Sequence, residues 1–188
     1  MTVRMCSLGI AVAALGVAAC DNQKSGNDTV AAQISDAQKA AGTKTIAAGL
    51  PVNSRFAAIA KAAGLDQTLA GPGPYTVLVP DDAAFAKAPA GSLDPTPENR
   101  AQLTGALTNM ILPGTVLAAD IGKAIDNGKG KAVLATMGGG TVTATKEGGN
   151  IVLTDAAGNK ATVTKADDQY SNGVVHHVDA VLMPKRAG

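Results

Sequence analysis

The sequence predicts an α+β fold, in which helices near the amino end pack against a mainly antiparallel β-sheet. Three observations support this. The chain has 188 residues, a length that suits one domain. Apolar residues of its first half recur with helical spacing. Its second half contains short β-rich runs about ten residues apart, separated by glycine-rich turns. Helices followed by a meander of strands are typical of α+β domains.

The first helix and the first strand are expected between residues 56 and 80. Phe56, Ile59, Ala60 and Ala63 follow helical spacing, and Gly64 stands where a C-cap glycine is expected. The rigid loop Gly71–Pro74 precedes a short β-rich run, Tyr75–Val79, which Pro80 ends.

Three further helices are expected before residue 127. Asp81 can cap a short helix that runs to Phe85. Thr96 is expected to cap the next helix, with Pro97 at its first position. Its apolar face is predicted to comprise Leu103, Leu107, Met110 and Ile111. Pro113-Gly114 ends that helix, and Asp120–Asp126 forms a short one.

The remainder of the chain predicts a meander of strands. Glycine-rich turns at 138–140, 148–150 and 158–159 suit hairpins between them. The expected strands are Val133–Thr136, Thr141–Thr145, Ile151–Thr154, Ala161–Lys165 and Val174–Leu182.

The first 20 residues have the pattern of an export signal. Arg4 precedes the apolar run Leu8–Ala19, which is shorter than the roughly 20 apolar residues of a spanning helix. Val17-Ala18-Ala19-Cys20 resembles the lipobox of bacterial lipoproteins, so Cys20 is expected to carry the lipid anchor. The alternative is a plain signal peptide with an incidental cysteine. We therefore expect a signal peptide at 1–19, a flexible tether at 20–44 and one domain at 45–185, exported to the periplasmic face of the bacterial cell envelope.

Composition argues against nucleic acid as a partner. The net charge is +1 and aromatic residues make up 2% of the chain, whereas nucleic-acid-binding proteins usually carry a basic patch or a stacking platform.

The sequence also lacks a convincing catalytic or metal motif. His176 and His177 are the only histidines, and neighbours on a strand point to opposite faces, so they cannot jointly chelate a metal. Ser171 has no nucleophile-elbow motif around it. Gly122–Gly130 departs from a phosphate loop in its spacing and in its last residue. We therefore expect a protein that is not an enzyme and uses no cofactor or metal, with a hydrolase dependent on His176 or His177 as a distant alternative.

Two segments, in order and about a hundred residues apart, resemble the signatures of the fasciclin domain family. The resemblance covers roughly Thr45 to Lys185, and the fold it implies is a single fasciclin-like domain with helices on a β-sheet wedge. The matching residues of the first signature are Thr76, Pro80, Asp81, Asp82, Ala84 and Phe85. Those of the second are Asn172, Gly173, His176 and Asp179, followed by an apolar strand that ends at Pro184.

The resemblance implies a non-enzymatic binding or adhesion module, here on the cell envelope, with an unidentified protein or glycan partner there or on a neighbouring cell. The alternative is an envelope carrier or sensor that binds a small molecule in an apolar cavity. His176 is expected to be buried and hydrogen-bonded. Asn109-Met110 replaces the Tyr-His that many members carry and that is linked with integrin adhesion in animals, which puts that mode of binding in doubt.

Overall fold

The computed structural model describes residues 42–88 and 91–184. The expected signal peptide, Cys20 and nearly all of the expected tether lie outside these ranges. Residues 42–44 lie inside them. There the Gly42 N–H donates to the Gln169 carbonyl, and the Ser171 N–H donates to the Lys44 carbonyl. The folded domain therefore includes Gly42 and Lys44, which the sequence analysis assigned to the tether. Within the described ranges, no helix is both long and apolar enough to cross a membrane.

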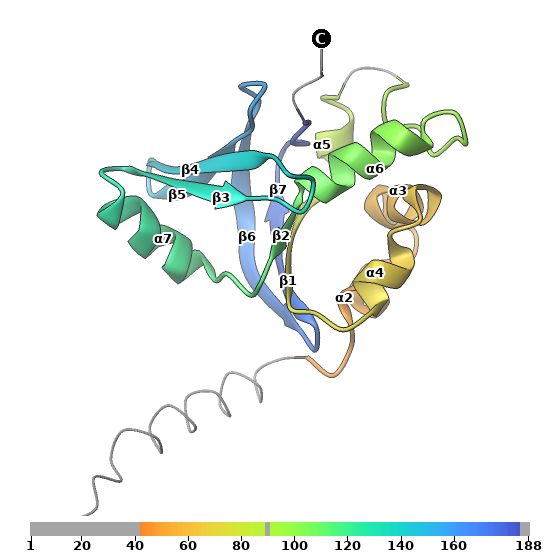
Figure 1. Cartoon of the computed structure of the whole chain (residues 1–188), viewed down its shortest axis with the longest axis horizontal. Helices are drawn as coiled ribbons and strands as arrows, with labels where there is room; N and C mark the ends of the chain where they lie inside the picture. Colours follow the sequence, from red (N-terminus) through yellow and green to blue (C-terminus); the bar gives the residue numbers. More distant parts are fainter. Residues whose placement is uncertain (1–41, 89–90, 185–188) are drawn as a thin grey trace, which may run out of the picture. The chain divides into compact units, whose positions relative to one another are not determined.

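Helices are concentrated in the first half of the described chain and strands in the second (Figure 1). The helices are α2 (Ile46–Gly49), α3 (Arg55–Ala63), α4 (Asp66–Ala70), α5 (Asp82–Phe85), α6 (Arg100–Asn109) and α7 (Ala118–Asn127). The strands are β1 (Tyr75–Pro80), β2 (Ile111–Pro113), β3 (Lys131–Ala135), β4 (Thr141–Glu147), β5 (Asn150–Thr154), β6 (Lys160–Tyr170) and β7 (Gly173–Val178).

The strands form one sheet in the order β2-β1-β7-β6-β5-β4-β3. Within residues 42–88 and 91–184, only β1 and β7 pair in parallel, and every other neighbouring pair is antiparallel. The last strand therefore lies between the first strand and β6. This confirms the α+β prediction and the mainly antiparallel sheet.

Two groups of helices cover the sheet (Figure 1). Helices α2, α3, α4 and α6 lie beside the end formed by β1 and β2, whereas α7 lies beneath β3 and β4. Helical spacing turns Phe56 and Ile59 of α3 into the core, and the same periodicity buries Ile121 and Ile125 of α7. Gly64 ends α3 in the left-handed conformation (φ 77°), as its C-cap position predicts.

The helix predicted between the cap Thr96 and the stop at Pro113-Gly114 is wrong at both ends. The helix α6 begins at Arg100, and Pro97 lies in the turn before it. The Asn99 amide donates to the Gly91 and Asp94 carbonyls, which stabilises the preceding loop instead of capping the helix. At the other end, Ile111 belongs to β2, where it pairs with Val77 of β1. Pairing between segments far apart in sequence outweighs the helical pattern there.

Two other expectations need correction. The final strand ends at Val178, not at Leu182. Asp81 occupies the N-cap position of α5, but its side chain makes no capping hydrogen bond. Its carboxylate instead accepts a hydrogen bond from the Thr164 hydroxyl at 3.3 Å and lies 3.6 Å from a ring nitrogen of His177.

Candidate functional site

Two signature side chains, Thr76 and His176, hold the loop at 114–118, which connects β2 to α7. The Thr76 hydroxyl donates to the Gly114 carbonyl at 2.7 Å and accepts from the Val116 N–H at 2.8 Å. Parallel pairing of β1 with β7 aligns Thr76 with Val174 and Leu78 with His176, which places Thr76 and His176 on the same face. The two signatures therefore meet in space.

His176 is fully buried, and backbone groups engage both of its ring nitrogens. Nδ1 accepts the Asp167 N–H at 3.2 Å, which leaves Nε2 as the donor to the Val116 carbonyl at 2.9 Å. The Asp167 carboxylate accepts the Ala118 N–H at 2.8 Å, where α7 begins. The predicted buried, hydrogen-bonded role of His176 is confirmed. This arrangement leaves no ring nitrogen for general-base catalysis.

Asn172 and Gly173 join the start of β7 to the helices. The Asn172 carboxamide accepts the buried Ile46 N–H at 2.8 Å and donates to the carbonyls of Leu69 and Gly71. Gly173 has a φ of 154°, and a Cβ there would overlap the Tyr75 carbonyl. Only glycine permits this close approach of β7 to β1.

The remaining signature residues also stabilise the fold. Asp82 accepts the Arg55 N–H at 3.0 Å, so it satisfies a free donor at the start of α3. Asp179 accepts the Thr162 N–H and continues the pairing beyond β7. The other three are buried at the contact of β1 and α5 with the core: Pro80, Ala84 and Phe85.

His177 lies on the opposite face of β7 between two carboxylates. Its Nε2 lies 3.1 Å from Asp168, and its Nδ1 lies 3.6 Å from Asp81. Lys165 also donates to Asp168, at 2.7 Å. Burial alone would raise the pKa of the Asp168 carboxyl, but hydrogen bonds from Lys165 and His177 outweigh it and hold that pKa below its ordinary value.

The His177 cluster does not have the geometry of a metal or hydrolase site. The two carboxylates face different nitrogens of the same ring, so one ion cannot contact all three groups. No group of three His, Cys, Asp or Glu side chains in the described part of the chain is arranged to hold a metal ion.

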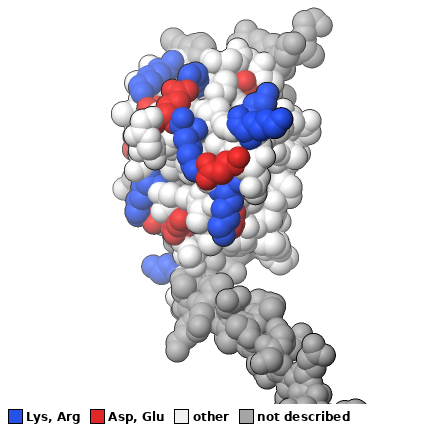
Figure 2. All heavy atoms as spheres, turned by 90° about the vertical axis from the view of Figure 1, so that its left-hand side faces the viewer, with Lys and Arg blue, Asp and Glu red and all other residues white. Residues whose placement is uncertain are grey.

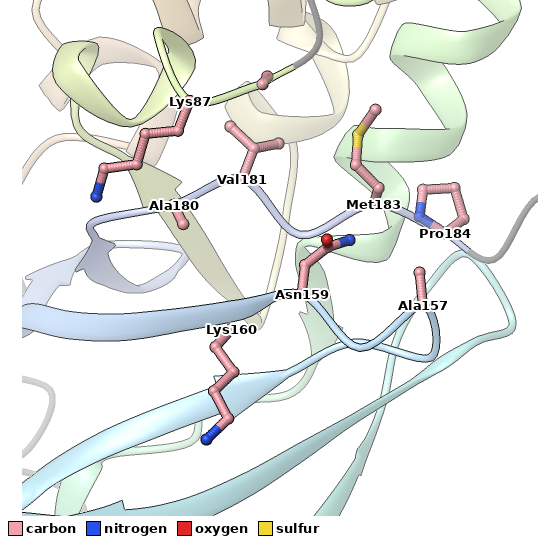
Figure 3. A pocket seen from close by; sticks show the side chains of 9 residues that line it. Lys87, Ala157, Asn159, Lys160, Ala180, Val181, Met183 and Pro184 are labelled. Atoms are coloured by element: carbon pink, nitrogen blue, oxygen red, sulfur yellow. The ribbon is translucent and has the colours of Figure 1, made fainter.

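A surface pocket of about 630 Å³ lies where the segment after β7 passes the β5–β6 turn (Figure 3). Its apolar lining includes Ala157, Ala180, Val181, Met183 and Pro184. Lys87 and Lys160 extend toward one side of it, away from Met183 and Pro184 (Figure 3). Lys87 donates to the Asp179 carbonyl, and Lys160 pairs with Glu147 at 2.7 Å. The pocket opens at the surface, unlike the core cavity that the sequence suggested.

Asp155 fixes one wall of this pocket, and the sequence analysis missed it. The residue is buried, and its carboxylate accepts from the backbone N–H groups of Ala157, Asn159 and Met183 and from the Asn159 amide, at 2.8–2.9 Å. An aspartate before a glycine-containing turn is a detectable Asx-turn signal. Its hydrogen bond to Met183 is long-range and has no local signal.

Acidic and basic side chains alternate on the face that carries α7 and the outer strands (Figure 2). Lys146 pairs with Asp126 at 2.7 Å, and Lys123 lies 3.9 Å from Asp120. This face therefore has no extended field of one sign.

The segment that departs from the family pattern is buried. Asn109 is 3% exposed and Met110 is 1% exposed. The Asn109 carbonyl oxygen accepts the Thr136 hydroxyl, whereas its amide nitrogen has no partner. Neither side chain presents a surface for a partner.

These features and the fold define a fasciclin-like domain, and comparison with known proteins agrees. The model of the fasciclin domain matches residues 51–184, so the chain belongs to the fasciclin domain family. It is 34% identical over 142 residues to protein sll1483 of Synechocystis sp., with 74% of this chain and 71% of that protein covered. It is 32% identical over 112 residues to immunogenic protein MPB70 of Mycobacterium bovis, with 60% and 51% covered.

Among solved structures, the FAS1 domain pair of the insect cell adhesion molecule fasciclin I matches with a TM-score of 0.63 at 18% identity. The match covers 76% of this chain and 51% of that one. The chain thus spans about half the length of MPB70 and of the insect domain pair. The structural match supports the fold alone.

Proposed function

We propose that this chain is a non-enzymatic binding or adhesion module, anchored by lipid on Cys20 at the periplasmic face of a bacterial cell envelope. The observation that carries the proposal is a fasciclin domain preceded by a sequence with the lipobox pattern Val17-Ala18-Ala19-Cys20. The partner is a protein or glycan of the envelope or of a neighbouring cell.

Two features support a binding role over catalysis. His176 uses both ring nitrogens to hold backbone groups of the fold. His177 lies between the carboxylates of Asp168 and Asp81, and within residues 42–88 and 91–184 its side chain contacts no nucleophile. The solved fasciclin I domain pair comes from a cell adhesion molecule.

The anchor is tested by labelling the full chain with a fatty-acid analogue and separating the membrane fraction. Cys20→Ser should abolish both the label and membrane retention of processed protein. Cys6→Ser is the matched control and should keep both, because Cys6 lies inside the expected signal peptide. Processed Cys20→Ser protein that still carries lipid would contradict the anchor. Crosslinking in intact envelopes followed by capture of the chain would identify the partner.

The pocket of about 630 Å³ favours a second candidate, a carrier or sensor of a small apolar molecule. Its volume lies within the roughly 300–1,000 Å³ of known ligand sites. The full chain is screened for ligands by native mass spectrometry, beside two variants. Ala157→Arg places a large side chain at the exposed rim, and Val52→Arg is a control at an exposed residue that does not line the pocket. A carrier should retain a ligand that Ala157→Arg loses and Val52→Arg keeps. Equal retention by both variants would reject the pocket as the site.

A further inference from the structure

Among the described strands, β3 ends the sheet and pairs with β4 alone. Beyond the last ladder pair, the Thr136 N–H donates to the Gly140 carbonyl at 3.0 Å. Hydrogen-bonded pairs alternate along an antiparallel ladder, so Leu134 and Ala132 also bond to β4. Val133 and Ala135 therefore direct their backbone N–H and C=O groups away from β4.

At one end, the outward side of β3 lies close to β2. Two residues after Ala135, the Met137 N–H donates to the Ile111 carbonyl of β2 at 2.8 Å, which agrees with the alternation. In the described part of the chain, no hydrogen bond reaches the outward groups of Val133 and Ala135. The Val133 side chain is 64% exposed. Such an unpaired edge can pair with another strand.

This edge is complementary to itself. If two copies pair antiparallel with a two-fold axis at Val133, each Val133 N–H meets the Val133 carbonyl of the other copy. Lys131 then lies opposite Ala135, so the lysines do not face each other. A net charge of +1 and the alternating charges in Figure 2 leave little repulsion between copies.

We propose that the chain associates with itself by antiparallel pairing of β3 strands about Val133. One strand pair buries less than the roughly 1,200 Å² of a stable interface, so the association is weak and reversible. It does not depend on the lipid anchor, and its test is independent of the proposed function.

A cysteine at the axis provides a direct test. Residues in a hydrogen-bonded antiparallel pair have Cα atoms about 5.5 Å apart, within the roughly 4.4–6.8 Å range of disulfides. Val133→Cys, placed in the full chain that carries Cys6→Ser and Cys20→Ser, should form a disulfide-linked dimer under mild oxidation in detergent. Val52→Cys is the control: the residue is 88% exposed, lies between α2 and α3 and not on β3, and should link at least tenfold more slowly.

Three further variants test the register and the strand pairing. Lys131→Cys mixed with Ala135→Cys should form a heterodimer, whereas each alone should not, because four residues of strand separate the like positions by about 13 Å. Val133→Pro removes an N–H that β4 does not use, so it should keep the melting temperature and lose the dimer in sedimentation equilibrium. The proposal is overturned if Val133→Cys links no faster than Val52→Cys, or if the mixed pair fails to link. Linkage of Val133→Cys only to a different protein would also overturn it, in favour of an extended peptide as the occupant.

Discussion

Replacement of His176 by alanine tests the central reasoning about the signatures. The change removes the acceptor for the Asp167 N–H and the donor to the Val116 carbonyl. A buried polar group left without a partner costs about 1–3 kcal/mol. Because two such groups lie beside a partly exposed loop, we expect a loss of about 3 kcal/mol in the free energy of unfolding. For a domain of this size, that lowers the melting temperature by about 6–12 °C.

Urea denaturation and thermal melts measure the loss, and amide hydrogen exchange localises it. Exchange should accelerate most at the N–H groups of Asp167 and Ala118, since His176 orders the 114–118 loop. The control is His177→Val, which removes a partly exposed contact with Asp168 and should change stability by less than about 1 kcal/mol. A His176→Ala protein that melts like the parent, or a larger loss in His177→Val, would refute the reasoning.

Three further predictions concern single residues. Gly173→Ala should prevent folding or cost more than about 3 kcal/mol, because its Cβ overlaps the Tyr75 carbonyl; circular dichroism checks this. Asp155→Asn should lower the free energy of unfolding, measured by chemical denaturation, by about 2–4 kcal/mol. Both carboxylate oxygens of Asp155 accept from N–H groups, and the amide NH₂ of asparagine would place a donor opposite one of them. Asp168 has a folded-state pKa below its ordinary 3.8, so it stabilises the fold above that pH and this contribution is lost as pH falls through the folded value. Asp168→Asn should therefore have a lower melting temperature than the parent at pH 6, and the difference should shrink below about pH 3.8. A difference in melting temperature that grows as the pH falls would contradict this.

Local patterns predicted much of the fold. Helical spacing and Gly64 placed α3, and alternation with glycine turns placed β4 and β5. The start of α6 and the identity of β2 were wrong. Ile111 continues a helical pattern in sequence, and only its pairing with Val77 makes it a strand. Such pairing depends on segments that one-dimensional periodicity does not connect.

For the candidate site residues, too, local sequence predicted burial but not the contacts between distant segments. The burial of His176 was predicted, but its partners Val116 and Asp167 were not, because they come from two other parts of the chain. The side chain of Asp81 was assigned to a helix cap from local sequence, whereas in space it faces His177 and Thr164. The surface pocket depends on the path of the chain after β7, which no motif specifies.

The position of β7 also determines when the domain can form during synthesis. This strand occupies the centre of the sheet, yet it is built from residues 173–178 of a 188-residue chain. Until those residues leave the ribosome, β1 and β6 have no strand between them. Contacts between distant segments also form slowly, because a long loop must close first. The domain therefore cannot complete its sheet until residues 173–178 have been made, although the strands on either side of β7 are made earlier.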